Sequence, residues 1–441
     1  MRVYRYIFVL CLLSIVLSPA KAQDFARMSE QTIMGTARYT GMSGAMTAIG
    51  GDPSAAADNP AGLGLYRRDE ALITLGGEFD KARQTGTTHT GWVNSFALPH
   101  VSLVLSLPAN NPSDEGVQFN NFMFSYQRLH SFNRNWLASG GSDASLGAVL
   151  AGLTQVPWDI PFCADRYNSS NALSVTERGY VNQFSFDWAM NISNRWFVGA
   201  GLQIQSLRMS SEGDFKETFS DVDFYNRNRT SLLFTGTTCT FSAGLIYRPL
   251  GWLRLGVGIK TPSLGALRTY TAGTLYALTD SLRASYAPEC VDRDGSFHLP
   301  LHLSTSVAFQ IGAYGLIALQ YDYSHAKQMA DLHSLRAGFE VIPVMGLYIN
   351  GGYAIESAFK RFDKVVPIDQ TFERQDAYFM NTRWTQYVSA GIGYRGTFVV
   401  VQAAYQYRWQ HADLYAHEYA APYDINATTH RIVVTIGWHR D

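Results

Sequence analysis

Charged residues on the polar side of alternating segments are the side chains of this sequence that could do chemistry. Arg254, Lys260 and Arg408 each stand in such a position. A cation there could bind a ligand carboxylate, and arginine suits this best because its planar fork binds carboxylate in two places. The same cations could instead pair with Asp187 and Asp322, since buried charges are usually paired. The sequence therefore predicts either ligand carboxylate contacts or interior ion pairs.

Motifs for catalysis or cofactor binding are not found in the sequence. No Gly-x-Ser-x-Gly elbow is present, the 11 histidines show no ligand spacing, and signatures for phosphate or dinucleotide binding are absent. We therefore expect no catalytic residue, no metal site and no cofactor, and we expect that the protein is not an enzyme.

The first 22 residues have the three parts of a secretory signal peptide. Arg2 and Arg5 supply the positive start, Ile7–Leu17 is a short apolar core, and Ala20-Lys21-Ala22 gives a small-x-small cleavage site. The apolar core is too short for a spanning helix, which needs about 20 residues. We predict a signal peptide at 1–22 and export of the mature chain.

The composition is that of an exported membrane β-barrel. Net charge is −1, charged residues make up 16% and aromatic residues 13%, and there are 38 glycines. Low charge with abundant Tyr, Phe and Gly, an export signal and no long apolar run favour an outer-membrane barrel. The near-neutral balance argues against nucleic acid as a partner. We assign no function to the three cysteines of the mature chain, Cys163, Cys239 and Cys290.

Alternation of apolar and polar residues tests the barrel, because each strand must show lipid on one side and lumen on the other. Val399–Gln410 splits almost cleanly in this way. A soluble β-sandwich also alternates, but many of these segments exceed the 5–6 residues usual in soluble sheets. We predict an all-β, antiparallel transmembrane barrel of about fourteen strands, and we assign 266–278 to a hairpin arm in an outer loop. The predicted strands are 70–80, 92–107, 117–129, 180–191, 195–209, 231–248, 251–262, 297–310, 313–325, 333–342, 346–356, 383–395, 397–410 and 428–438.

The segment Arg38–Leu65 is rich in small residues and does not alternate. It ends in Asn59-Pro60-Ala61-Gly62, and so little side-chain bulk lets a segment pack closely against neighbouring backbone. We predict a compact plug at 23–68 inside the barrel formed by 69–441. Asn59 before Pro60 could also be a turn and nothing more.

This plug resembles the N-terminal hatch of the FadL/TodX family of outer-membrane transporters for hydrophobic compounds. Gly244–Pro249, followed by Leu253–Gly256 and Lys260-Thr261-Pro262, is similar to the family's pattern of strand, turn and strand. The resemblance covers nearly the whole mature chain and implies fourteen strands. It implies that the hatch element Asn59-Pro60-Ala61-Gly62 shifts to let ligand pass. The chain departs from the family in ending on His439-Arg440-Asp441, after an aromatic Trp438.

A strand kink is the last candidate feature. Proline cannot donate to a ladder, so Pro99 within the second predicted strand marks a bulge. The resemblance implies a gap in the barrel wall at such a kink, through which an apolar ligand leaves sideways. A bulge with no route is the alternative.

The sequence as a whole favours a passive, ligand-gated channel for hydrophobic small molecules, either long-chain fatty acids or aromatic hydrocarbons. We expect a monomer in the outer membrane of a Gram-negative bacterium, in contact with lipid and lipopolysaccharide and inserted by the barrel-assembly machinery. A structural or adhesive barrel that uses long outer loops is the main alternative, and an outer-membrane lipid hydrolase is a further one.

Overall fold

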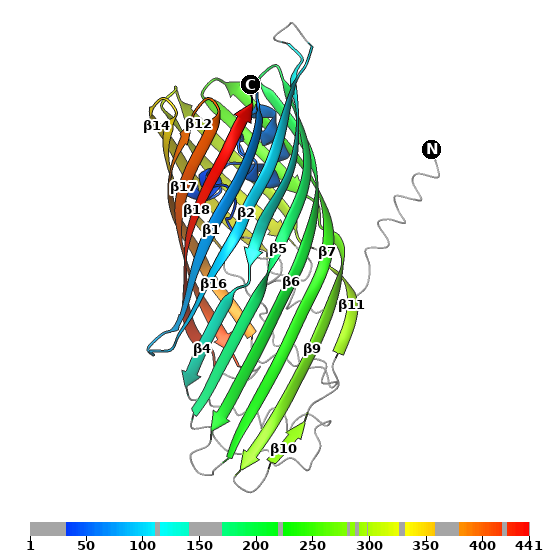
Figure 1. Ribbon diagram of the computed structural model, residues 1–441, viewed down its shortest axis with the longest axis vertical. Coiled ribbons are helices and arrows are strands. Elements are labelled where there is room, and N and C mark those ends of the chain that lie inside the picture. Colours follow the sequence, from blue (N-terminus) through cyan, green and yellow to red (C-terminus); the bar gives the residue numbers. More distant parts are fainter. Residues whose placement is uncertain are drawn as a thin grey trace, which may run out of the picture.

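One sheet closed on itself makes up most of the molecule (Figure 1). The computed structural model describes residues 32–110, 115–140, 170–218, 224–279, 283–286, 291–297, 299–325, 331–357, 379–416 and 421–440. The strands are β1 (Asp69–Gln84), β2 (Thr90–Pro108), β3 (Val117–Ser131), β4 (Arg134–Gly140), β5 (Ser170–Ile192), β6 (Trp196–Thr218), β7 (Phe224–Leu250), β8 (Leu253–Lys260), β9 (Leu264–Thr279), β10 (Arg283–Tyr286), β11 (Val291–Phe297), β12 (Leu301–Ile311), β13 (Gly315–His325), β14 (Leu332–Val344), β15 (Leu347–Glu356), β16 (Phe379–Arg395), β17 (Val399–Tyr415) and β18 (Tyr423–Arg440).

The barrel closes between its first and last strands. β1 pairs with β18 along its whole length, from Asp69↔Arg440 to Gln84↔Ile425, and it pairs with β2 on its other side. Every pairing that the structure describes is antiparallel, and closure removes the open edges that a sheet would otherwise expose. The alternative of a soluble sandwich of two sheets is therefore wrong.

Three of the wall strands are split in two. β3 and β4 both pair with β5, β8 and β9 both pair with β7, and β11 and β12 continue one another beside β9 and β8. Counting each split strand once and leaving out the short β10 gives a 14-strand barrel, as predicted.

The assignment of 266–278 to a hairpin arm in an outer loop is largely wrong. β9 continues β8 in the barrel wall and pairs with β7 from Cys239↔Leu264 to Phe224↔Thr279. Its hairpin partner β10 adds only a short pairing. The reason is the length of β7, 27 residues, whose backbone donors and acceptors need a partner strand along their full extent.

Side-chain alternation matches the prediction on both faces of the wall. On β18 the outward Ile432, Val434, Ile436 and Trp438 are exposed, whereas Arg431 is buried inside. Aromatic side chains also gather on the outer surface near the hatch end of the barrel, where Trp196 stacks on Tyr247 and Trp252 on Phe309. An exterior of this kind suits a lipid environment with interfacial aromatic girdles.

The hatch, by which we mean residues 32–68, lies inside one end of the barrel. It contains α3 (Ala37–Gly41), η1 (Ser54–Ala57) and η2 (Pro60–Leu65), and nearly all its residues are buried. Figure 1 shows it as the dark blue ribbon at the end where β18 finishes, which we call the hatch end. Its apolar side chains, among them Ile33, Met42 and Met46, pack against the inner wall. None of the described helices is long and apolar enough to cross a membrane.

Some predictions fall outside the described residues. These are the signal peptide at 1–22, Cys163 and Cys290. Cys239, in β7, is a free thiol. The domain limits at 22/23 and 68/69 stay predictions, although β1 begins at Asp69.

Candidate functional site: the hatch and its seat

The predicted hatch element is a capped turn fastened to the wall. The side chain of Asn59 caps η2 by accepting a hydrogen bond from the Ala61 N–H at 3.1 Å. Its Nδ2 donates to the Thr47 carbonyl at 2.9 Å, inside the hatch, and to the Leu245 carbonyl of β7 at 3.4 Å. Pro60 takes the first helical position, where its missing N–H costs nothing. Asn59 therefore holds its own turn together and ties it to the barrel.

Glycines of the inner wall form the surface on which the hatch rests. We call six of them the seat glycines: Gly199, Gly244, Gly256, Gly258, Gly338 and Gly352. A Cβ on Gly256 would lie 2.6 Å from the Thr47 carbonyl oxygen, and one on Gly338 would lie 2.9 Å from the carbonyl oxygen of Met42. At Gly258 it would overlap the Asp58 carbonyl, and at Gly244 the Asn59 side chain. Hatch backbone therefore touches wall backbone directly.

A buried charge cluster joins the hatch to three strands, β8, β13 and β14. Lys260 Nζ of β8 lies 3.4 Å from Asp58 Oδ1, and Arg336 Nη1 of β14 lies 3.6 Å from Asp58 Oδ2. The Tyr39 hydroxyl donates to Asp58 Oδ2 at 2.7 Å, and Arg336 Nε pairs with Asp322 Oδ2 of β13 at 2.9 Å. These five residues form the hatch charge cluster. All are almost fully buried, so removing one partner leaves an uncompensated charge.

Two further arginine links hold other parts of the hatch. Arg38 of α3 donates to both carboxylate oxygens of Glu340 in β14, at 2.7 and 3.0 Å. Arg431 of β18 donates from Nε to Glu78 of β1 at 2.6 Å and from Nη1 to the Ile33 carbonyl at 2.8 Å. Because β1 and β18 form the closing seam, Arg431 joins the hatch to both sides of it.

Acid should release the hatch only well below neutral pH. Burial acts to raise the pKa of the Asp58 carboxyl, but Lys260 and Arg336 outweigh it, and the net pKa lies below its ordinary value. An unfolded aspartate titrates near 3.9. The stabilisation from Asp58 is therefore complete above that value and is lost only as pH falls through the lower folded pKa.

The pH prediction can be checked by ionic conductance of the purified protein in planar bilayers, with pH lowered in steps. We expect low conductance at neutral and mildly acid pH and a rise only in strong acid, and an Asp58→Asn variant should lack the step. Opening at mildly acid pH would contradict this, since histidines titrate there.

The three predicted carboxylate-binding cations do not come together. Arg254 donates to the Ile49 carbonyl of the hatch and to Gln310 Oε1, both at 2.9 Å, and Lys260 pairs with Asp58. Arg408 lies on β17, with its guanidinium 3.3 Å from Gln410 Oε1. Lys260 is in an interior ion pair, the alternative left open by the sequence, but its partner is Asp58 and not Asp187 or Asp322. Arg254 binds a hatch carbonyl and a glutamine, which neither alternative described. Their role toward a ligand stays a prediction.

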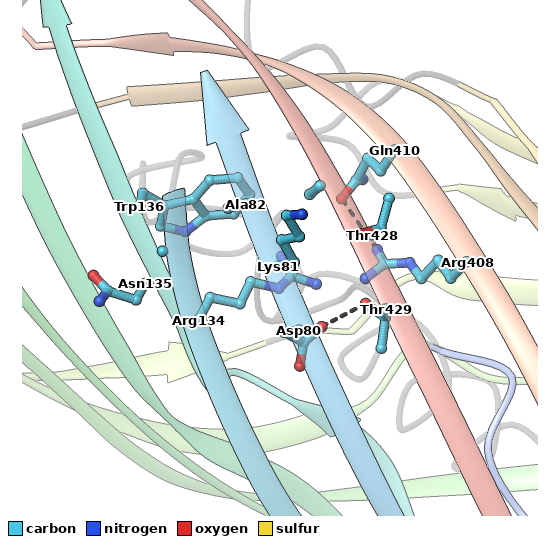
Figure 2. Close-up of a pocket in the computed structure, with 12 residues that line it drawn as sticks. Asp80, Lys81, Ala82, Arg134, Asn135, Trp136, Arg408, Gln410, Thr428 and Thr429 are labelled. Atoms are coloured by element: carbon cyan, nitrogen blue, oxygen red, sulfur yellow. Dashed lines mark hydrogen bonds between the residues drawn. The ribbon is translucent and has the colours of Figure 1, made fainter. Parts of the chain in front are cut away.

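Arg408 lines a pocket at the inner wall, away from the hatch (Figure 2). The pocket is small, with a cavity volume of about 20 Å³, and is bounded by β1, β2, β4, β17 and β18. Figure 2 shows Arg134 and Trp136 of β4 facing Arg408 and the Asp80–Thr429 hydrogen bond across it. Trp136 also belongs to an apolar cluster that joins β4, β5 and β6 to the opposite strands β17 and β18. Side chains from different parts of the wall therefore pack on one another at this end of the barrel.

The wall is irregular at Pro99. Two residues of β2, Leu98 and Pro99, stand opposite the single Leu75 of β1, which is a bulge. In the described part of the chain, β2 pairs with β3 only from His100↔Gln127 to Pro108↔Phe119, while its residues 90–97 pair with β1 alone. The predicted bulge is therefore present, and the ladder between β2 and β3 stops beside it.

Several solved structures have a similar fold. The chain is similar to a FadL homologue from Pseudomonas aeruginosa, with 12% identity, 92% of this chain and 99% of that chain covered, and a TM-score of 0.60. It is also similar to the toluene transporter TbuX of Ralstonia pickettii, at 12% identity, 93% and 99% coverage and a TM-score of 0.56. It is similar as well to TodX, the toluene transporter of Pseudomonas putida, with 13% identity, 92% of this chain and 98% of that chain covered, and a TM-score of 0.54. The chain has the FadL/TodX fold. The resemblance predicted from the sequence is confirmed at this level.

Identities this low show the fold alone. Toluene is the compound named for TbuX and TodX, and it is not assigned to this chain. No family model and no curated protein matches the sequence.

Within this FadL/TodX-type barrel, the seat glycines and Asp58 are the residues that sequence reasoning missed. A signal was available for two of them, because Gly256 and Gly258 alternate on the inward side of β8 between Arg254 and Lys260. Two glycines on a lumen face leave a strip of bare backbone, which a plug can touch. Asp58 stood next to the recognised Asn59, but its partners Lys260 and Arg336 lie 202 residues and more away along the chain.

Proposed function

We propose that this protein is an outer-membrane channel for passive uptake of hydrophobic small molecules, gated by the hatch. The observation that carries the proposal is a hatch seated entirely by noncovalent contacts, bare glycine backbone and a few buried ion pairs, in the lumen of a barrel with an apolar exterior. Such a plug closes the lumen to water and ions until its noncovalent contacts with the wall are broken.

The inner wall supplies an apolar surface between the hatch and the distal cluster. Leu207 and Met209 of β6, Phe234 of β7 and Leu267 of β9 form part of one buried apolar group on the lumen side. A solute that has lost its water gains by contact with such a surface. The ligand would rest there before the hatch element Asn59-Pro60-Ala61-Gly62 shifts.

Exit sideways at Pro99 is part of the proposal. The ladder between β2 and β3 ends at His100, and the first described hatch residue lies close by, since the Thr32 N–H donates to the Leu129 carbonyl of β3 at 3.1 Å. A shift of the hatch would therefore change the lining of this break. An apolar ligand leaving there enters the membrane without crossing water.

Uptake assays in cells test the proposal. We expect expression-dependent uptake of a radiolabelled long-chain fatty acid or of toluene, and a several-fold change when Asn59-Pro60-Ala61 is replaced by Gly-Gly-Gly. The change removes a helix cap worth about 1 kcal/mol and the fixed backbone of Pro60. Pro99→Thr, which offers an N–H where the ladder stops, should slow uptake without weakening ligand binding.

Heat-modifiable gel mobility must show that every variant assembles. Uptake of neither solute by an assembled barrel would overturn the proposal and favour a structural or adhesive barrel. A monomer in the outer membrane of a Gram-negative bacterium, inserted by the barrel-assembly machinery and bordered by lipopolysaccharide, completes the proposal.

A further inference from the structure

Three neighbouring strands carry the same change from apolar to polar toward the hatch. Along their inner faces β5, β6 and β7 run in register, so that each row holds one residue from each strand. The rows, starting from the apolar group and ending at the hatch, are Val181–Leu207–Gly236, Gln183–Gln205–Thr238, Ser185–Gln203–Thr240, Asp187–Gly201–Ser242 and Ala189–Gly199–Gly244. Gly199 and Gly244 are seat glycines, so the polar rows lie between the apolar wall and the hatch.

The first polar row, Gln183–Gln205–Thr238, is satisfied within the wall. Gln205 Nε2 donates to Gln183 Oε1 at 2.9 Å, and Gln183 Nε2 donates to Ser185 Oγ at 3.0 Å. Thr238 Oγ1 reaches Gln205 Oε1 at 3.4 Å. These side chains bind one another and need no further donor.

The rows nearer the hatch are not satisfied. Asp187 is 0% exposed, and neither of its carboxylate oxygens has a hydrogen-bond partner among the described residues. Gln203, also 0% exposed, donates from Nε2 to Ser242 Oγ at 2.8 Å, but its Oε1 has no partner in the same part of the chain. A Cβ on Gly201 would overlap Asp187 Oδ1 and lie 2.6 Å from Ser242 Oγ, so these groups converge over that glycine. The buried Thr240 hydroxyl is likewise unpartnered.

Buried polar groups are nearly always hydrogen-bonded, and leaving a carboxylate oxygen without a donor is costly. The unpartnered atoms of Asp187 and Gln203 are acceptors, so the group that completes them must be a donor. Lys260, in register with Ser242 on the next strand, is committed to Asp58. A donor that enters the lumen, either water or the polar head of a ligand, can complete these acceptors.

We propose that Asp187, Gln203 and Thr240 form the head-group site for an amphiphile whose polar end donates hydrogen bonds, an alcohol or an alkylammonium, with its tail on the apolar wall. The site rests on the proposed function and names its substrate class. A carboxylate head has acceptors only and cannot donate to the unpartnered oxygens, so the site disfavours fatty acid anions. Contact with Asp187 also places the ligand head against the seated hatch.

Equilibrium dialysis against the full-length protein in lipid nanodiscs tests this site. The probes are decanol, decylammonium, decanoate and decane at neutral pH, with empty nanodiscs subtracted. We expect decanol and decylammonium to bind about tenfold more tightly than decanoate. Asp187→Leu should bring all four within about twofold of one another. Asp187→Asn, which keeps the shape and an acceptor oxygen but cannot carry a charge, should weaken binding of decylammonium relative to decanol.

Asp214→Asn is the matched control, because Asp214 lies on β6 in a partly exposed ion pair with Arg227 and Arg229; it should leave all four affinities unchanged. Equal binding of all probes by the unaltered protein, or tighter binding of decanoate, would overturn the head-group site and leave the proposed function standing. No saturable binding of any probe, decane included, would overturn the proposed function and the site with it.

Discussion

Replacing Asp58 by leucine is expected to unseat the hatch while leaving the barrel assembled. The change leaves Lys260 buried with no partner and removes one of the two carboxylates that face Arg336. Breaking a buried pair in this way costs ~3–5 kcal/mol. The hatch should bear most of this cost, because the wall keeps its own strand pairing and Arg336 keeps Asp322.

Hydrogen exchange of residues 39–65 in the purified protein measures the effect, with amides of β13 and β14 as internal reference. We expect far faster exchange in the hatch, and higher conductance to small ions, with unchanged exchange in the wall. The double variant Asp58→Leu/Lys260→Met removes both members of the closest pair, so it should recover part of the protection. Hatch exchange in Asp58→Leu equal to that of the unaltered protein would contradict the role of the cluster.

Gly258→Val is expected to open the lumen from the wall side. Its Cβ would overlap the Asp58 carbonyl and lie 3.2 Å from the Asn59 Cβ. Overpacking costs ~1–3 kcal/mol where side chains can move, and here the obstacle is backbone, which yields less readily. We expect the seated state to lose population and the conductance to rise several-fold.

The matched control is Gly77→Val in β1, because a Cβ on Gly77 would meet only the Phe79 ring, at 3.6 Å. Both variants put a β-branched residue into a wall strand, so they share any gain in strand propensity. Equal conductance of the two would show that Gly258 is no seat for the hatch.

The barrel itself was predictable because its signal is local. A period of two can be read within a single strand such as Val399–Gln410, and burial follows it residue by residue in β17. The strand count was also correct, although the sequence did not show that β9 (Leu264–Thr279) extends β8. β9 extends β8 because the long neighbouring strand β7 needs a partner along its full length. The sequence pattern within β9 itself does not reveal this.

The site was predictable only in part, because its contacts join residues far apart in the chain. Asn59 could be recognised, since its capping role depends on Ala61 two residues on. The pairing of Asp58 with Lys260 could not, because many cations faced the lumen and nothing local chose among them. The bulge at Pro99 was again local chemistry, since the missing N–H of proline dictates it.

The link from Arg431 to Glu78 and Ile33 has a consequence for how the molecule is built. The hatch and β1 are made first, yet their partner on β18 lies 398 residues after Ile33. Bringing such distant segments together has a high entropic cost and is slow. A hatch already in place lowers that cost, because it offers two hydrogen-bonding groups to β18. The Ile33 carbonyl accepts from Arg431, and the Ala37 N–H donates to the Thr435 hydroxyl. The plug would then act as an assembly template, so variants that loosen it should also accumulate as unclosed sheets during biogenesis.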